Sequence, residues 1–564
     1  MRFPKIFHAD LGNVHHAAFW LGFFGILSAT LGLLRDRLLA GTFGASRELD
    51  IYYAAFRVPD FLYTILLLFT ASTAIIPIFL KNFNEDKEKA AELLGSIIIY
   101  FSFALLVLSA VAFFFMPEFV KFSLPGFSEE DLGRTTLLSR ILLLSPIFLG
   151  FSNIFSSVAQ AFRRFFVYGL APVFYNIGII LGISVFYNFF GLPGLAWGVA
   201  LGALLHMALQ IPSLRNVGVL PKFKEIKGRS ELLKIMWLSL PRTLGLSITQ
   251  FTTLILTGIA STFYQGSIAI FNLALNLEYI PVTIVGLSYS VAAFPNLVSF
   301  SLSKAKDDFR KHFSAAIRHI MFWTFPMAVL ILVLRAQIVR VILGSGAFNW
   351  ADTRLTAAAL AILSLAIIFQ SLFMLLVRAF YAEGESWRPL AINIVSALLS
   401  IGAAFWFSSE FSTGGVLADF FRTALKLDGI ADLRVIALSL GIFIGGFFNF
   451  IFLFLAFRAS FGWFPTDGIG RAVFQIISAS LIAGLVSYWG LNVFSLFFNL
   501  HTFLGVFLQG FLAGILGILV FLGILWSLGN KELAEAYFSL RGLFKEKQKS
   551  REDMVPAPEP EKLL

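Results

Sequence analysis

The sequence predicts an all-α polytopic membrane protein with about 14 transmembrane helices. Of its 564 residues, 58% are hydrophobic and 13% are charged, whereas soluble domains carry roughly 25% charged residues. Apolar runs of about 20 residues, the length that crosses a bilayer as a helix, recur along the chain. The strands of an outer-membrane barrel would instead alternate apolar and polar residues over about ten positions, a pattern that this sequence lacks.

Charge clusters or Gly, Pro and Asn turns separate most of these runs. The first run ends in Arg35-Asp-Arg37 rather than in a small-residue cleavage site, so we interpret it as a retained helix and not as a signal peptide. The expected spans are 16–40, 51–81, 91–115, 136–161, 168–190, 194–213, 232–262, 267–300, 312–335, 354–383, 387–408, 433–457, 470–492 and 502–528.

The net charge of +10 comes from 43 Lys and Arg residues against 33 Asp and Glu residues. Most of the basic residues fall in loops on the side of the two termini, as in 81–89, 215–234 and 304–318. Basic loops remain in the cytoplasm, so we expect both termini to be cytoplasmic. We expect no nucleic-acid partner, because no basic run is interleaved with stacking aromatic residues.

A weak internal repeat predicts two lobes in parallel orientation. Ala40–Ser46 resembles Ala260–Ser267, and each copy is followed by a helix with a proline, Pro59 or Pro281, which we expect to act as a hinge or kink. Chance likeness of apolar helices is the alternative. The expected parts are an N-terminal lobe (1–213), a basic linker (214–231), a C-terminal lobe (232–457), two added helices (458–528), and an amphipathic segment with a disordered tail (529–564).

Ionisable and amide side chains inside the spans form polar stripes on the first two helices of each lobe. Ionisable groups in a bilayer cost about 2.5–3.5 kcal/mol on insertion scales and usually face a partner or a cavity. We therefore expect a water-filled cavity between the lobes. Its candidate residues are Arg35, Asp36, Asp50, Arg57, Asp60, Arg242, Asn276 and Glu278.

Simpler interpretations remain for some of these side chains. Asp50 has the chemistry of a helix N-cap, and the cluster Arg35–Arg37 has that of an interfacial ion pair. Arg57 lies two turns inside a span and needs a partner, for which Asp60, one turn on, is the expected residue.

The sequence favours a secondary transporter over an enzyme. It has no cysteine and no phosphate-binding loop, and the acidic clusters 85–86 and 129–131 lie in loops without matching partners. We expect no cofactor and no metal site. Without a nucleotide site, the driving force is expected to be the membrane potential or a monovalent cation gradient.

Several motifs resemble the MurJ (MviN) family of bacterial lipid II flippases, in the multidrug/oligosaccharidyl-lipid/polysaccharide exporter superfamily. The resemblance covers about residues 17–460. Its most specific part is the opening, Leu31-Gly-Leu-Leu-Arg-Asp-Arg37, Phe43-Gly-Ala-Ser46 and Ala54-Ala-Phe-Arg-Val-Pro59, and the segments 125–127, 159–165, 171–176, 343–348 and 378–381 support it.

The resemblance implies site residues only in part. Arg35, Asp36 and Asp50 match the family pattern. Ala29, Tyr63 and Asn276 stand where the family has cavity arginines, and Leu68 stands where it has a glutamate. We expect Arg57 and Arg242 to supply the missing positive charge.

The resemblance implies a function, a location and partners. It implies a flippase of the bacterial cytoplasmic membrane that carries lipid II, the undecaprenyl-pyrophosphate-linked cell-wall precursor, to the outer leaflet by alternating access. The two added helices would form a groove for the lipid tail, and membrane lipids and wall-synthesis proteins would be partners. The alternatives are a flippase for another lipid-linked oligosaccharide, a multidrug or cation exporter, a membrane scaffold of the wall-synthesis machinery, or, third, an enzyme.

Overall fold

The computed structural model describes residues 14–70, 72–162, 164–212, 229–462 and 469–538, and every regular element in these ranges is helical. The N-terminal half comprises α1 (Val14–Phe43), α2 (Arg47–Ala55), α3 (Arg57–Thr70), α4 (Ser72–Glu85), α5 (Lys87–Phe114), α6 (Met116–Ser123), α7 (Glu129–Leu142), α8 (Leu144–Ala161), α9 (Phe165–Leu181), the π-helical η2 (Gly182–Phe186), α10 (Tyr187–Phe190) and α11 (Leu192–Ala208). The C-terminal half comprises α13 (Arg229–Ser261), α14 (Ser267–Pro281), the π-helical η3 (Val282–Leu287), α15 (Ser288–Leu302), α16 (Lys306–Ile342), α17 (Trp350–Ala382), α18 (Trp387–Thr413), α19 (Val416–Ala424), α20 (Val435–Phe461), α21 (Ile469–Phe494) and α22 (Phe503–Ser527).

Within the described residues, 12 helical segments are long and apolar enough to cross a membrane. The expected count of 14 is therefore not confirmed. The other two expected spans correspond to α1, whose second half carries Arg35-Asp-Arg37, and to α11, an apolar helix of 17 residues. Most of the expected linker, at 213–228, and the tail from 539 onward lie outside the described residues, while 531–538 are helical.

Two of the expected continuous spans are divided, and a proline explains each division. The span expected at 51–81 is broken after Ala55, and α7 ends at Leu142 inside the span expected at 136–161. Pro59 and Pro146 each follow the break by four residues. A proline ring clashes with the carbonyl of the residue four positions earlier, so these helices end where that carbonyl lies.

Pro281 lies beside a different irregularity. It is the last residue of α14, and the π-helical turns of η3 follow it before α15 begins. Prolines and π-turns are the usual causes of helix bending. Both repeat-related prolines thus adjoin a helix irregularity, and their role as hinges stays a prediction.

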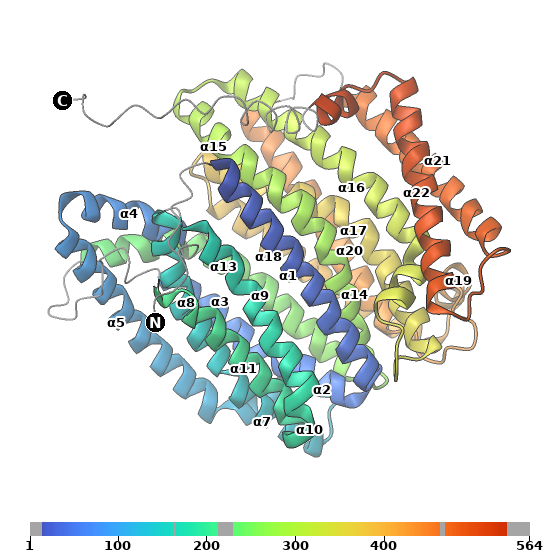
Figure 1. Cartoon of the computed structure of the whole chain (residues 1–564), viewed down its shortest axis with the longest axis horizontal. Helices are drawn as coiled ribbons and strands as arrows, with labels where there is room; N and C mark the ends of the chain where they lie inside the picture. The colour runs from blue at the N-terminus through green and yellow to red at the C-terminus, as the bar shows by residue number, and fades with distance from the viewer. Residues whose placement is uncertain (1–13, 71, 163, 213–228, 463–468, 539–564) are drawn as a thin grey trace.

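The helices pack mainly within each half of the chain. α9 packs against α1 and α11, and in the second half α17 packs against α16 and α20 while α18 packs against α20. Figure 1 shows α4, α5, α8 and α11 at the left, α1 crossing the centre, and α21 and α22 along the right edge, where they pack against α16. α13 joins the halves, because it packs against both α3 and α18.

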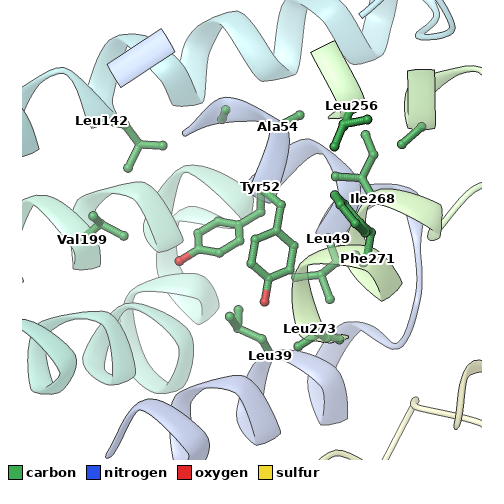
Figure 2. Close-up of a cluster of buried hydrophobic side chains, with 14 of the residues drawn as sticks. Leu39, Leu49, Tyr52, Ala54, Leu142, Val199, Leu256, Ile268, Phe271 and Leu273 are labelled. Carbon is green, nitrogen blue, oxygen red and sulfur yellow. The ribbon is translucent and has the colours of Figure 1, made fainter. Parts of the chain in front are cut away.

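One hydrophobic cluster continues across the two halves. Figure 2 shows Leu39 and Leu49, from α1 and α2, beside Phe271 and Leu273 of α14. These side chains are at most 1% exposed. The contact between the halves therefore includes a dry core, around which the polar groups of the next section are arranged.

Glycines bring the backbones of α9 and α11 into direct contact. A Cβ atom added at Gly198 would lie 2.3 Å from the Cα of Gly182, and one at Gly178 would lie 2.2 Å from the Cα of Gly202. Close backbone approach through small residues is typical of helix pairs in membranes. Where these glycines meet, α9 and α11 consequently leave no room for any side chain between them.

We predict that Gly198→Ala destabilises the protein. The added methyl group must push two backbones apart, an overpacking that costs roughly 1–3 kcal/mol. Thermal unfolding in detergent should show a lower Tm. Gly402→Ala in α18 is the matched control, because a Cβ there meets nothing within 4 Å and alanine favours a helix over glycine. An equal Tm for the two variants would contradict the close contact between α9 and α11.

Candidate functional site

A polar network joins α1 to α14 across the two halves. Arg35 binds Oδ1 of Asp36 through Nε at 2.9 Å and Nη2 at 2.8 Å. Asn276 of α14 donates from Nδ2 to the other carboxylate oxygen of Asp36 at 3.0 Å. Asp36 is 3% exposed, and a buried carboxylate requires such partners. Three of the predicted site residues are thus brought together.

Asn176 of α9 extends this network toward the start of α1. Its Oδ1 accepts from Arg35 Nη1 at 3.5 Å, and its Nδ2 donates to Ser28 Oγ at 3.1 Å. The Arg35 side chain nevertheless keeps 24% of its surface exposed. A guanidinium has five donors, so an anionic ligand can still reach Arg35 while Asp36 holds it.

Arg57 makes a second connection between the halves. Its Nη2 donates to Oδ1 of Asn272 on α14, and Asn272 donates in turn to the Ile268 carbonyl at 2.7 Å. The expected partner, Asp60, lies close enough to interact electrostatically with Arg57, but among the described residues the side-chain hydrogen bond goes to Asn272. The break after Ala55 makes Arg57 the first residue of α3, on the side of α14. Its Nε is buried without a partner.

Asp50 forms the most buried of the contacts between the halves. It is 1% exposed, and its two oxygens accept hydrogen bonds from the backbone N–H groups of Gly266 at 2.6 Å and Ala269 at 2.9 Å. These N–H groups open α14, where the helix dipole favours a negative charge. Asp50 therefore caps a helix of the opposite half, while Ser46 caps its own helix α2.

Backbone contacts close the same end of the bundle. The Ala347 N–H donates to the Gly41 carbonyl at 2.8 Å, and Arg37 Nη1 donates to the Val341 carbonyl at 2.6 Å. Gly266, at φ 87°, approaches so closely that a Cβ there would lie 2.2 Å from the Ala45 carbonyl oxygen. We call this set of contacts, around residues 37–50, 264–269 and 341–352, the closed end.

Asp432 fixes the loop that leads into α14. It accepts hydrogen bonds from the Tyr264 N–H at 3.1 Å and from the side chain of Arg434, which also lies over the Phe263 ring. Burial alone would raise the pKa of Asp432, but the hydrogen bonds from Arg434 and from backbone N–H groups outweigh it and hold the pKa below its ordinary value. The carboxylate thus stays ionised and keeps Gly266 in place.

The boundary between the two halves, which we call the seam, is not packed in this way at its opposite end. Near the start of α1, a Cβ added at Gly22 or Gly25 would meet nothing within 4 Å, whereas one at Gly41 would lie 2.7 Å from Ser345 Oγ. α13 shows the same contrast. A Cβ added at Gly245 would meet only Asn393 Nδ2, at 3.9 Å, whereas one added at Gly258 would lie 2.6 Å from the Ser123 carbonyl oxygen. Both helices are therefore tight at the closed end and loose at the other.

The remaining predicted residues lie outside these networks. Glu278 is 2% exposed, and its Oε1 is buried without a hydrogen-bond partner. Asp60 is partly buried beside Pro59, in the first turn of α3. Arg242 lies within α13, and its side chain is outside the described part of the structure.

Sequence reasoning missed several groups of the site. Asn176 and Asn272 are amides within apolar runs, and Asn272 shares the expected polar stripe with Asn276, but neither is among the candidate site residues. The partners of Asp50 are backbone N–H groups, which no residue type reveals. The closed-end contact of residue 41 with residue 347 likewise involves only backbone atoms.

The chain matches a family model described as "Lipid II flippase MurJ" over residues 39–508. The probable lipid II flippase MurJ of Buchnera aphidicola subsp. Acyrthosiphon pisum is 31% identical over 383 residues, which cover 66% of this chain and 74% of the relative. The lipid II flippase MurJ of Burkholderia cenocepacia is 26% identical over 496 residues, covering 85% and 91%.

Solved structures share the fold. A lipid II flippase MurJ in an inward closed conformation matches with a TM-score of 0.71 and 24% identity, covering 90% of this chain and 98% of that one. An inward-facing multidrug resistance MATE family transporter of the MOP superfamily matches with a TM-score of 0.63 and 16% identity, covering 79% and 96%. With the family model matching most of its length, this multi-pass membrane protein belongs to the lipid II flippase MurJ family.

Proposed function

We propose that the protein carries lipid II from the inner to the outer leaflet of the bacterial cytoplasmic membrane by alternating access. The observation that carries this proposal is the seam between the two halves, where Arg35 and Arg57 lie in a chain that belongs to the MurJ family. The pyrophosphate of lipid II is a dianionic acceptor that guanidinium groups bind through charge-assisted hydrogen bonds.

Arg35 and Arg57 would hold the pyrophosphate. Asp36 and Asn276 keep Arg35 in place, so its remaining donors are preorganised for an anion. Arg57 has a buried Nε that lacks a partner, and phosphate oxygens would satisfy it. Arg242, which belongs to α13, would add charge where Asn276 replaces the family's arginine.

The structure would represent the state that receives substrate from the cytoplasm. Basic loops place the termini in the cytoplasm, so the closed end, where α1 finishes and α14 begins, would face outward. Opening it requires Asp50 to release α14, and α21 and α22 would guide the lipid tail alongside. Membrane lipids and wall-synthesis proteins would be its partners, and no chemical step is needed, which makes it a transporter rather than an enzyme.

A membrane potential or a monovalent cation gradient would drive the cycle. Glu278 is the best candidate for coupling, because an isolated carboxylate in a bilayer is costly and this one lacks a partner at Oε1. A bound proton or monovalent cation would offset that cost. No cofactor enters the proposal.

One observation favours a second candidate function, transport of a different lipid-linked oligosaccharide. Tyr63 and Asn276 stand where the family resemblance places arginines, and both are engaged, Tyr63 by Asn153 and Asn276 by Asp36. A headgroup with less negative charge would suit such a site. A scaffold role predicts instead that substitutions in the seam are harmless.

We predict that the wild-type chain rescues cells depleted of their own lipid II flippase and that Arg57→Ala does not. Losing a hydrogen bond to a charged group costs roughly 1.5–3 kcal/mol, equivalent to about 10- to 100-fold in binding. Surface-exposed lipid II is the readout. Arg134→Ala, which removes an exposed arginine from α7, is the matched control and should rescue.

Three other outcomes of this assay are informative. Failure of the wild-type chain despite good membrane expression would favour the other oligosaccharide. Full rescue by Arg57→Ala would remove Arg57 from the site. If all seam variants rescue, including Arg35→Ala, while changes in the cytoplasmic loops do not, the scaffold role is supported.

We further predict that a disulfide across the closed end stops transport. A Cβ at Gly41 would lie 3.7 Å from Ser345 Cβ, within the range of about 3.5–4.5 Å found in disulfides. The chain has no cysteine of its own, so Gly41→Cys with Ser345→Cys forms one defined pair. Oxidised membranes should lose lipid II exposure and regain it on reduction.

The two single cysteine variants are the controls and should respond to neither oxidant nor reductant. The extent of cross-linking is measured by the mass shift of a thiol-blocking reagent. Undiminished transport by a fully cross-linked pair would contradict alternating access through this end.

A further inference from the structure

A pocket of about 500 Å³ lies outside the seam, between the end of α16 and the starts of α17 and α22. Its polar lining comes from Gln337 and Arg340 of α16, from His501, and from Gln509 of α22, with Trp350 beside them. None of the residues that form the seam networks lines it. At the lower right of Figure 1, these helix ends meet near the edge of the molecule.

The pocket is built to receive an anion. The Arg340 guanidinium lies 5.6 Å from the Trp350 ring centroid and makes no hydrogen bond or ion pair among the described residues. No acidic residue is found among the described residues that line the pocket. Arginine held against an aromatic face is oriented with its donors available, and His501 adds a second donor.

The pocket also offers an unused acceptor. Gln337 Nε2 donates to Gln509 Oε1 at 3.3 Å, and Gln509 Nε2 donates to the Leu491 carbonyl at 2.9 Å. This chain fixes the orientation of both amides and leaves Gln337 Oε1 buried without a partner. A buried carbonyl oxygen of this kind costs about 1–3 kcal/mol, which a ligand hydroxyl or ammonium group would recover.

An exposed aromatic stripe runs along α22 and begins two residues after His501, which lines the pocket. Phe503, Phe507 and Phe511 are 57%, 39% and 51% exposed. Successive rings are stacked with centroids 6.4 and 5.5 Å apart. Such a stripe in a membrane helix faces acyl chains, so an apolar surface begins close in the chain to a polar, cationic pocket.

We propose that this pocket binds the headgroup of a phospholipid. Its phosphodiester would lie at Arg340 and His501, its hydroxyl or ammonium donor at Gln337 Oε1, and one acyl chain along Phe503, Phe507 and Phe511. Free phosphate shares the anionic chemistry but has no use for the aromatic stripe. With the termini in the cytoplasm, the lipid would come from the outer leaflet and would be distinct from the transported substrate.

This site adjoins the closed end. Val341 and Ile342, whose carbonyls accept hydrogen bonds from Arg37, directly follow Arg340 in the chain. Arg37 also lies over the Phe503 ring at 5.4 Å. A phospholipid in the pocket would therefore brace the segment of α16 that contacts α1.

Native mass spectrometry of the delipidated full chain tests the site with phosphatidylglycerol as the probe. Arg340→Gln should weaken binding by roughly tenfold or more, because a charge-assisted hydrogen bond is lost. Gln337→Glu keeps the shape of the pocket and places a negative charge beside the phosphate, so it should weaken binding similarly. If Arg340→Gln fails to fold, the binding measured for Gln337→Glu tests the proposal in its place.

The matched control is Lys121→Gln, which also removes one positive charge. Lys121 is exposed in α6, paired only with exposed Glu129, and its substitution should leave binding unchanged. Dioleoylglycerol, which lacks the phosphate, and glycerol 3-phosphate, which lacks the chains, should both fail to compete.

Other outcomes would overturn the proposal. Equal binding by both pocket variants and the wild type would show that the lipid sits elsewhere. Equal weakening by Lys121→Gln would reduce the effect to surface charge. Competition by dioleoylglycerol would leave only an apolar stripe, and competition by glycerol 3-phosphate would indicate a site for soluble phosphate. Lipid II is absent from the experiment, so its result is independent of the transport proposal.

Discussion

The structure depends on a constraint set by the bilayer: a charge inside it must find a partner inside the protein. Asp50 meets that constraint with the N-terminus of a helix from the other half, which offers two N–H groups and a favourable dipole. Asp36 meets it with Arg35 and Asn276, and Arg57 meets it with Asn272. Arg35 and Arg47 are partners from the same half as the aspartates that they neutralise, but Asn272, Asn276 and the start of α14 lie in the other half. These polar contacts therefore also hold the two halves together.

The same constraint explains why the halves can also separate. A hydrogen bond between a carboxylate and helix N–H groups loses little when water replaces one partner, because water is also a good donor. The hydrophobic contact of Leu39 and Leu49 with Phe271 and Leu273 is different, since its burial is lost outright on opening. A transported ligand, or a bound phospholipid, must therefore shift a balance that the dry core and the polar seam set jointly.

Much of the fold could be predicted from the sequence, because apolar length and loop charge are local properties. The limits expected for α21 and α22 agree with the structure within two residues. The breaks after Ala55 and Leu142 each precede a proline by four residues, but proline alone does not predict a break, because Pro172, Pro241 and Pro326 lie inside continuous helices. The site was harder to predict. Asp60 is the partner expected for Arg57 because only neighbours in a helix can be paired from sequence, and the two do interact electrostatically. The hydrogen-bonded partner, Asn272, lies 215 positions away and could not be predicted. Asp50 was recognised as capping chemistry, but the helix that it caps is not its own.

The closed end joins main chain to main chain at Gly41 and Ala347, and side chain to main chain at Arg37 and Val341. Backbone carbonyls belong to every residue type and backbone N–H groups to every type except proline, so most substitutions at Ala347 or Val341 leave these contacts intact. Two consequences follow for genetics. Alanine scanning would detect the side chains of Arg37 and Asp50 but would pass over the main-chain contacts. Correlated substitutions between residues 41 and 347 would be sparse even though the two residues touch. Selection should act most visibly on the glycines of the closed end, because any side chain there would clash with a neighbouring atom. A search for gating residues in such a chain should therefore look first for positions that tolerate only glycine, and then for positions that need a particular functional group.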